Sequence, residues 1–317
     1  MLDDDWRGRR VVVRHWAGTS AAGREEFRDV LGDLLQTGDE IVVDTRSGRC
    51  RIPRAAVASA RLVHPAAVDQ LGLEAIAARG WRPRTVETSP DGWLLRADAG
   101  WTGRANSALA LHSLRRPLPA VTADLSTWYA AHGLPARVQV PLPALSALDH
   151  GLEELGWTVG DDVDVLVARL DLLADQDADP PNQYGLDFSP TPTPDWLAGY
   201  HYRGGALPPP AAALLSRHDR VVFLTARDPG GRVAGVARGA VDDGWLGITA
   251  VDVVPSRRRQ GCGRQLMLAL GRWGAGKGAQ RCYLQVSTGN RAAATFYGRL
   301  GFHRHHTYRY RDAPHRP

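Results

Sequence analysis

Cysteine, lysine and glutamate are each scarce in all or part of this sequence of 317 residues. The three cysteines, Cys50, Cys262 and Cys282, are odd in number and far apart, which excludes a dense disulfide framework and a cysteine-rich zinc site. Lys277 is the only lysine, and residues 190–317 contain no glutamate. A glutamate general base is therefore excluded from that half of the chain.

Long apolar runs are also missing from the sequence. No stretch has the length of a transmembrane helix, and the first six residues, MLDDDW, are acidic where a secretory signal would be basic. We therefore expect a reduced, cytoplasmic protein that has no membrane partner and binds no metal.

Charge is distributed unevenly along the chain. Residues 190–317 hold 19 lysines and arginines against 7 aspartates, a net charge of +12, whereas residues 1–189 carry a net charge of −7. The basic half favours an anionic partner, although solubility alone also accounts for such a surface.

The pattern of elements divides the chain into four parts. Residues 1–66 show closely spaced strands and turns, typical of a small β-barrel, and residues 67–178 mix strands with helices. Residues 179–194 are rich in Pro and Asp and are expected to be a linker or an ordered loop. In residues 195–317 we predict strands at 219–227, 232–240, 245–254, 281–287 and 303–311, and helices from about 260 and at 290–300.

A weak internal repeat links the second and fourth parts. DGWLLRADAG at 91–100 is echoed by DGWLGITAVD at 243–252, and RVQV at 137–140 by YLQV at 283–286. LEELGW at 152–157 is echoed in the same order by YGRLGF at 297–302. The repeat predicts a duplicated α/β unit, with chance similarity as the alternative.

The segment RRRQGCGR at 257–264 joins a predicted strand to a predicted helix, and the first copy has no counterpart of it. Glycines at a helix start let an anion approach free N–H groups, and Arg258 and Arg259 add positive charge, so the pattern indicates phosphate binding. It is not a P-loop, because no Gly-Lys-Ser/Thr follows, and Leu266 occupies the third glycine position of a dinucleotide fingerprint. A glycine-rich turn with solvated arginines is the structural alternative.

The residues Arg258-Arg259-Gln260-Gly261-Cys262-Gly263 resemble the Arg/Gln-x-x-Gly-x-Gly/Ala signature of the GNAT acyltransferases. TAVDVVP before it and LQVSTGNRAAATFYGRLGF after it resemble the flanking elements of that family, so that the resemblance covers residues 195–311. The wider layout, with RANS at 104–107 and HHTYRY at 305–310, is similar to actinobacterial acetyltransferases that begin with a Src-homology-like barrel. The resemblance implies an α+β GNAT fold, a mixed and mostly antiparallel sheet with flanking helices, in which a degenerate and a complete unit follow the barrel.

The resemblance also implies that acetyl-CoA is the cosubstrate. The predicted strand before the signature would flank the thioester and pantetheine arm, the glycine turn would hold the pyrophosphate, and Asn290, also well suited to cap a helix, would bond the arm. The residues assigned to the cofactor in this way are Val251, Asp252, Val253, Arg258, Arg259, Gln260, Gly261, Cys262, Gly263, Arg264, Asn290 and Tyr297.

Tyr297 falls on the general-acid position of the family, where a phenol protonates the departing thiolate. Ala293 and Ala294 lie on the same helix face and leave room for the sulfur. A core tyrosine is the alternative. One candidate for the general base is Asp252, for which a purely structural role is the alternative. The other candidates are a chain of water molecules and three histidines, His201, His305 and His306.

Arg309 and Arg311 are two residues apart on a predicted strand, so both would point to one face and bind a substrate carboxylate. Solvated surface arginines are the alternative. The sequence therefore favours acetyl transfer to a small primary amine, with glutamate as the first choice. Acetylation of lysines in a basic, histone-like protein tail and acyl-CoA binding without turnover remain open, and we expect no nucleic-acid partner.

Overall fold

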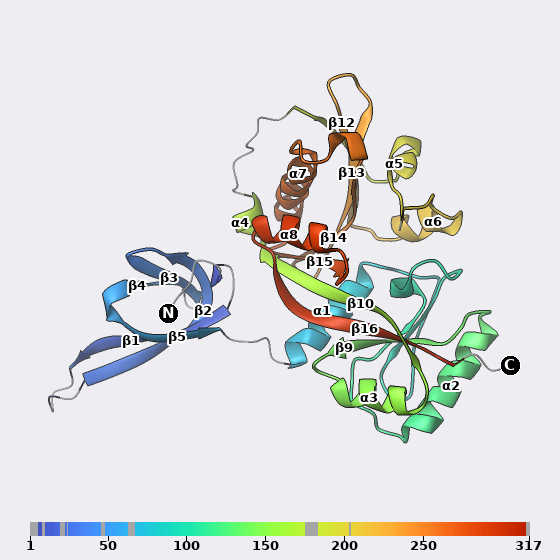
Figure 1. Cartoon of the computed structure of the whole chain (residues 1–317), viewed down its shortest axis with the longest axis horizontal. Coiled ribbons are helices and arrows are strands. Elements are labelled where there is room, and N and C mark those ends of the chain that lie inside the picture. Colours follow the sequence, from blue (N-terminus) through green and yellow to red (C-terminus); the bar gives the residue numbers. More distant parts are fainter. Residues whose placement is uncertain are drawn as a thin grey trace. The chain divides into compact units, whose positions relative to one another are not determined.

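The structure is a computed structural model that describes residues 6–7, 10–19, 23, 25–45, 48–62, 67–174, 183–202 and 204–314 (Figure 1). The chain divides into two compact units. One comprises residues 1–66 together with 297–303, and the other comprises residues 67–296 together with 304–317.

The N-terminal residues form a five-stranded antiparallel sheet with the order β4-β3-β2-β1-β5. Its core is aliphatic, with Val11, Val13, Leu34, Ile41 and Ile52 fully or almost fully buried. The elements are β1 (Arg10–Thr19), β2 (Glu25–Thr37), β3 (Glu40–Thr45), β4 (Gly48–Pro53), the 3-10 turn η2 (Arg54–Ala56) and β5 (Val57–Leu62).

An eleven-stranded mixed sheet carries most of the remaining chain. Its strands are β6 (Thr85–Thr88), β7 (Leu94–Ala97), β8 (Ala108–Leu109), β9 (Arg137–Leu142), β10 (Thr158–Arg169), β11 (Gly185–Ser189), β12 (Val221–Arg227), β13 (Val233–Asp242), β14 (Trp245–Val253), β15 (Arg281–Ser287) and β16 (His303–Asp312). They lie in the order β11-β12-β13-β14-β15-β10-β16-β9-β8-β7-β6.

Helices connect and cover these strands. They are α1 (Ala67–Arg79), α2 (Leu118–Ala131), α3 (Ser146–Glu154), α4 (Leu170–Ala174), α5 (Pro194–Gly199), α6 (Pro210–Ser216), α7 (Cys262–Gly276) and α8 (Arg291–Arg299), with 3-10 turns η3 (Gly103–Ala105) and η4 (Pro255–Arg257). None of the described helices is long and apolar enough to cross a membrane.

The sheet order shows the internal repeat directly. Outward from the central strands β10 and β16, one side reads β15, β14, β13, β12 and the other reads β9, β8, β7, β6. On both sides the first pair outward is parallel, β14 with β15 and β8 with β9. The chain therefore contains two copies of one topology, which we call the first copy (β6 to β10) and the second copy (β12 to β16).

The two copies exchange their last strands. β10 follows β9 through α3, yet it pairs antiparallel with β15 of the second copy. β16 follows β15 through α8, yet it pairs antiparallel with β9 of the first copy. Because neither strand pairs with its own copy, the central part of each half depends on the other half being folded.

Two of the three sequence echoes mark equivalent places in this topology. RVQV and YLQV lie in β9 and β15, and LEELGW and YGRLGF end α3 and α8. The third echo differs, since DGW precedes β7 in the first copy but leads into β14 in the second, where β13 is the counterpart of β7. That echo reflects similar hairpin turns and not equivalent strands.

The two faces of the second copy are covered by different elements. Gly239 of β13 lies under α7, since a Cβ on it would come within 2.9 Å of a methyl group of Leu270. Side chains alternate along a strand, so Arg238 and Val236 point to the opposite face. There Val236 packs in a core with Trp81, Trp101 and Trp196, and Figure 1 shows α7 and the α5–α6 segment on opposite sides of β13.

The expected elements of the second copy are confirmed. β15 has the predicted bounds, and the predicted helix at 290–300 is α8. Within the expected linker at 179–194, residues 179–182 lie outside the described part of the chain. Residues 185–189 form β11, which pairs antiparallel with β12 at the edge of the sheet.

Candidate active site

Strands β14 and β15 of the second copy stop pairing before either strand ends. β14 and β15 pair in parallel from Trp245 with Arg281 to Ile248 with Leu284, and no further pairing joins them within the described residues. β14 nevertheless continues to Val253 and β15 to Ser287. The backbone of β14 beyond Ile248 is therefore available on that side to a ligand lying between the strands.

A bulge in β14 accompanies this divergence. Val236 pairs with Asp252 and Arg238 with Thr249, so β14 carries one extra residue between these pairs. Ala250 adopts a left-handed φ of 55°, which is strained for a residue with a side chain. The bulge twists the end of β14 and leaves Val251 out of the ladder with β13, whereas Asp252 and Val253 still pair with Val236 and Gly235.

The glycine turn begins α7 as predicted. Gly261 is the N-cap residue with a left-handed φ of 83°, and its carbonyl accepts the first helical hydrogen bond from Gln265 at 2.9 Å. The first N–H groups of a helix have no acceptor inside it, and the helix dipole gives them a positive potential. A Cβ on Gly263 would lie 3.3 Å from the ring of Phe296 on α8. The turn therefore presents backbone N–H groups with a positive potential, and Gln183 donates to the carbonyl oxygen of Gln260 beside them at 2.7 Å.

The arginines beside the turn differ in their partners. Arg257 forms an ion pair with Asp228 at 2.7 Å and so supports the β12–β13 hairpin. Arg258 donates from Nε to the carbonyl oxygen of Val253 at 2.9 Å while most of its side chain stays exposed. Arg258 can therefore reach an anion at the turn, whereas the guanidinium of Arg257 is already paired with Asp228.

Cys262 lies inside the turn and is buried. Burial raises the pKa of its thiol to about 11, so the thiol is protonated at neutral pH and is no nucleophile. Asn290 behaves as a helix N-cap, since its Oδ1 accepts from the N–H of Ala293 at 3.1 Å. The predicted bond from Asn290 to the cofactor arm stays a prediction.

Tyr297 lies on α8 four residues after Ala293 and is half-buried. Its ring makes an edge contact with Phe302, with 5.9 Å between ring centroids. Its carbonyl oxygen accepts the N–H groups of Leu300 and Phe302, which ends the helix. These two bonds hold the carbonyl group of Tyr297 at the end of the helix.

Two of the candidate bases meet in space. Asp252 accepts the backbone N–H of His201 at 3.0 Å, and the same Oδ2 lies 3.4 Å from Nδ1 of His201. The imidazole is about half exposed, and Arg258 lies 4.0 Å from the other carboxylate oxygen. Sequence reasoning named both residues but had no means of pairing them, because they are 51 positions apart.

The other two histidines form part of a buried chain that includes a glutamate from the first half. His306 Nε2 lies 2.7 Å from Glu74 Oε1 on α1, and His306 Nδ1 lies 2.8 Å from His305 Nδ1. Gln139 donates to the second oxygen of Glu74 at 2.6 Å. Glu74 is therefore a buried partner of His306, which sequence reasoning missed.

Arg309 and Arg311 have partners other than the expected substrate. Arg309 forms a two-bond pair with Asp162, at 2.7 and 2.8 Å, and a further bond to Asp149. Arg311, only 1% exposed, bonds Asp149 through two nitrogens and the carbonyl oxygen of Trp157. These contacts give both arginines a role in joining β16 to the first copy and leave Arg311 out of reach of a ligand.

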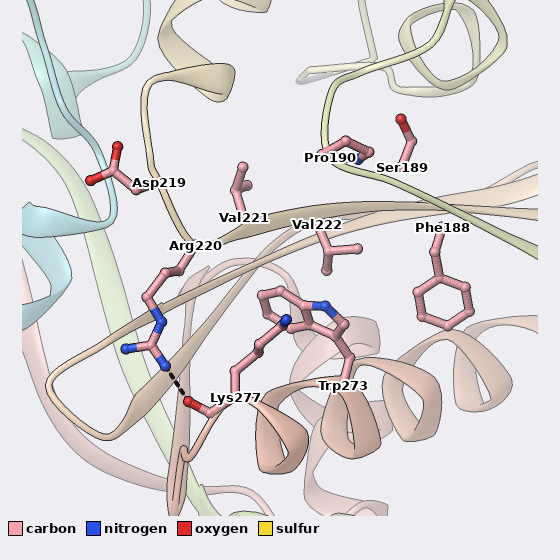
Figure 2. Close-up of a pocket in the computed structure, with 9 residues that line it drawn as sticks. All are labelled: Phe188, Ser189, Pro190, Asp219, Arg220, Val221, Val222, Trp273 and Lys277. Atoms are coloured by element: carbon pink, nitrogen blue, oxygen red, sulfur yellow. Dashed lines mark hydrogen bonds between the residues drawn. The ribbon is translucent and has the colours of Figure 1, made fainter.

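A separate pocket lies at the far end of α7. Figure 2 shows Trp273 of α7 and Lys277, which caps that helix, near Val222 and Phe188, with Arg220 bonded to the carbonyl oxygen of Lys277. Trp273 lies 12 residues after Gly261 along the helix, so it is about 18 Å from the glycine turn. No group of three or more His, Cys, Asp or Glu side chains is placed to hold a metal ion in the described ranges.

Comparison with solved structures finds the same fold. A GCN5-related N-acetyltransferase from Kribbella flavida superposes with a TM-score of 0.59 at 20% identity, covering 78% of this chain and 96% of that one. A tandem GNAT protein from the clavulanic acid biosynthesis pathway superposes with a TM-score of 0.53 at 16% identity, covering 79% and 95%. The predicted α+β GNAT fold with two units is thereby confirmed.

Comparison of sequences agrees. An uncharacterized N-acetyltransferase of Bacillus subtilis, YobR, is 26% identical over 243 residues, covering 73% of this chain and 93% of that protein. The probable histone acetyltransferase Rv0428c of Mycobacterium tuberculosis is 30% identical over 318 residues, covering 96% and 95%. Fold, site and relatives together define an acyltransferase of the GNAT N-acetyltransferase class, as predicted.

A narrower family also matches. The family described as the probable histone acetyltransferase Rv0428c C-terminal region matches residues 69–311, which span both copies. The chain belongs to this family.

Proposed function

We propose that the protein transfers the acetyl group of acetyl-CoA to the primary amine of a small acceptor, with an amino acid such as glutamate as the first candidate. The observation that carries the proposal is the glycine turn of α7 set beside strands that stop pairing after Ile248 and Leu284. Val251–Val253 would hold the cofactor arm, and residues 258–264 would hold the pyrophosphate.

Acetyl-CoA supplies the thioester whose acyl carbon the amine attacks. Tyr297 would donate its phenolic proton to the departing sulfur, which needs a proton to leave as a thiol. His201 would take the proton of the amine, because its imidazole is a base that is about half exposed and its Nδ1 lies 3.4 Å from Asp252 Oδ2. The two proton transfers would then be served by groups on different elements.

The second candidate is acetylation of lysine side chains in a protein. The printed name of the mycobacterial relative, a probable histone acetyltransferase, favours it. The net charge of +12 on residues 190–317 argues against it, because a lysine-rich tail would be repelled by that half of the chain.

Thiol release from acetyl-CoA, measured for the full-length protein with a panel of amines, tests the proposal. The panel holds glutamate, glutamine, a polyamine and a lysine-rich peptide, and mass spectrometry identifies each acetylated product. Turnover on an amino acid supports the proposal, and preference for the peptide supports the second candidate. Tight acetyl-CoA binding with no turnover on any amine would make the protein a binding module and would refute the proposal.

A further inference from the structure

Arg104 lacks the carboxylate partner that most arginines inside this fold have. Arg309, Arg311 and Arg257, like Arg116, Arg137 and Arg217, each form an ion pair with a buried or half-buried aspartate. Arg104 is half-buried as well, but no carboxylate bonds to it in the part of the chain that the structure describes. Its recorded contact is with an aromatic ring, that of Trp81, with 4.8 Å from the guanidinium carbon to the ring centroid.

A second buried cation lies on the same ring. The guanidinium of Arg238, 1% exposed, is 5.7 Å from the centroid of Trp81. It donates to the carbonyl oxygens of Leu215 and Gly80 and to the hydroxyl of Thr249, all of them uncharged. Burial lowers the pKa of Arg238 to about 10, which leaves it charged at neutral pH. Two positive charges therefore flank Trp81 without a negative charge bonded to either.

The titratable groups that act on Arg104 are tyrosines. Burial alone would lower the pKa of Arg104, but Tyr308, Tyr310, Tyr202 and Tyr200 act to raise it. Burial in turn raises the pKa of Tyr308 and Tyr310, and that of Tyr200 to about 12. Those three hydroxyls are neutral at physiological pH, so they offer dipoles and no charge. A cation–π contact contributes about 0.5–2 kcal/mol, less than the several kcal/mol that an ion loses on leaving water.

An unused hydrogen-bond donor lies in the same group of rings. Trp101 is 7% exposed, and its indole N–H has no hydrogen-bond partner among the described residues. Its ring makes edge contacts with Trp81, at 6.1 Å between centroids, and with Tyr202, at 5.3 Å. A buried donor without an acceptor is rare in a folded protein, and at a ligand site the ligand supplies the acceptor.

The loop that carries these donors is held rigidly. Asn106 accepts the N–H groups of Asp98 and Gly100 and donates to the carbonyl oxygens of Trp101 and Thr102, four bonds of 2.7–3.0 Å. Thr102 is held at a left-handed φ of 59°, a strained value for a β-branched residue. Such strain persists only where the surroundings fix the conformation, and it is concentrated at ligand sites.

The group formed by Arg104, Trp81, Trp101 and Arg238 adjoins the end of β14, where the acetyl group is expected. Arg238 bonds Thr249, the residue after the last parallel pair of β14 and β15, and its side chain lies on the face opposite α7. A cofactor with its phosphates at the α7 turn and its arm at the end of β14 would present the acetyl group toward this face. An amine that approaches from this face would pass Trp81, Trp101 and Arg104.

We propose that Arg104 and the indole N–H of Trp101, backed by the charge of Arg238 across Trp81, form a subsite for a carboxylate of the acceptor. The inference rests on the proposed acetyltransferase function and narrows its acceptor to an amine that carries a carboxylate, a small amino acid and not a lysine within a protein. A guanidinium binds a carboxylate through two parallel hydrogen bonds, and an indole donor adds a third. Arg104 and Trp101 come from the first copy, so the copy without a glycine turn would select the acceptor for the copy that has one.

Binding of glutarate tests the subsite without any turnover, because glutarate has two carboxylates and no amine. Tryptophan fluorescence and calorimetry of the full-length protein at 0.15 M salt should show saturable binding. Arg104→Gln should weaken it about 10- to 150-fold, the effect of losing a charged hydrogen bond, and Trp101→Phe about 2- to 10-fold. The matched control is Arg272→Gln, which removes one positive charge from the exposed face of α7 and should leave glutarate affinity unchanged.

Thermal unfolding separates a binding role from a structural one. Glutarate should raise the midpoint of the wild type and not that of Arg104→Gln. Arg104→Gln by itself should not lower the midpoint, since losing the cation–π contact with Trp81 is offset by no longer burying a charge that lacks a carboxylate partner. A lowered midpoint for Arg104→Gln, or equal glutarate affinity in the wild type, Arg104→Gln and Trp101→Phe, would overturn the proposal. Failure of acetyl-CoA to bind in a separate titration would refute the proposed function and leave the carboxylate subsite standing.

Discussion

The two copies of the fold differ most at the start of one helix. In the second copy α7 starts at Gly261 with every N–H of its first turn present. In the first copy the corresponding helix, α2, starts after Pro117 and has Pro119 in its first turn, so two potential donors are missing. Arg116 beside it is paired with Asp91 and Asp124 at 2.7 and 2.8 Å. By our proposal the start of α7 therefore holds an anion, whereas proline and the Arg116 ion pairs make the start of α2 unsuited to one.

The strand pairs beside these helices also differ, since only the second copy has a strand that continues beyond its last pair. β14 extends five residues beyond its last pair with β15, whereas β8 consists of two residues, both paired with β9. The position that echoes Tyr297 in the first copy is Leu152, which is fully buried in a core. The same topology therefore does not imply the same chemistry. By our proposal the second copy binds acetyl-CoA and carries the reaction, and the first copy supplies packing and acceptor contacts.

The largest effect should come from closing the open helix start. Gly261→Glu places a carboxylate where the diphosphate would lie, and like charges held in contact cost several kcal/mol, so acetyl-CoA affinity should fall ~100-fold or more. Calorimetry on the folded variant measures it. Gly261→Ala carries the backbone strain without the charge, and Ala120→Glu adds the same charge to the first turn of α2. Undiminished affinity in Gly261→Glu, or an equal loss in Ala120→Glu, would contradict the contrast between the helices.

The next largest effect is expected at Tyr297, whose counterpart in the first copy is Leu152. Tyr297→Phe should lower kcat by about 10²–10⁴, the usual contribution of one general acid, with unchanged acetyl-CoA affinity. Single-turnover acetyl transfer measures the chemical step. A loss of less than about threefold there would mean that another group or water protonates the sulfur.

The third effect concerns the junction of the copies. Arg311→Ala leaves Asp149 buried without its main partner and should lower the free energy of unfolding by roughly 3–5 kcal/mol, as breaking a buried pair does. Arg309→Ala should lower it less, because that side chain is 26% exposed. Urea unfolding gives both values. Normal stability with a raised KM for glutamate would instead restore the arginines to the substrate role expected from the sequence.

The smallest effect is on acid stability at the same junction. Burial alone would raise the pKa of Asp149, but hydrogen bonds and charge from Arg311 and Arg309 hold it below its ordinary value. A carboxyl with a lowered folded pKa stabilises the fold above its unfolded pKa of about 3.9, and this stability is lost as the pH falls further. Unfolding titrations should therefore show a loss of stability below about pH 4 that is smaller in Asp149→Asn. An equally steep loss in Asp149→Asn would exclude this carboxyl as its source.

Local sequence patterns predicted most of the helices and strands of the second copy. β15 and α8 were predicted almost to the residue, because alternating apolar residues bounded by Gly and Asn fix where such elements start and stop. β11 was missed in its Pro- and Asp-rich surroundings, since it exists only by pairing with the edge strand β12. Edge strands of this kind have little sequence pattern of their own.

Side-chain partners were less accessible to sequence reasoning. Arg309 and Arg311 share a strand face, as the period of two required, but Asp149 and Asp162 lie about 150 residues away in the chain and meet them only through the exchange of β10 and β16. Glu74 reaches His306 by the same long-range packing of α1 on the sheet. The sequence does carry one signal for the group around Arg104, since RANS at 104–107 resembles related acetyltransferases, but the resemblance implies no role for Arg104 or Asn106.

The sequence by itself determined the elements whose causes are local: the glycine turn, the helix after it and the alternating strands beside it. Only the tertiary structure decided which charges are neutralised and which are not. Arg311 and Arg104 look alike in the sequence, yet one is buried against Asp149 and the other faces tyrosines and Trp81. The physical reason is that a charge depends on every group within a few ångströms, and in an exchanged, duplicated sheet those groups come from distant parts of the chain.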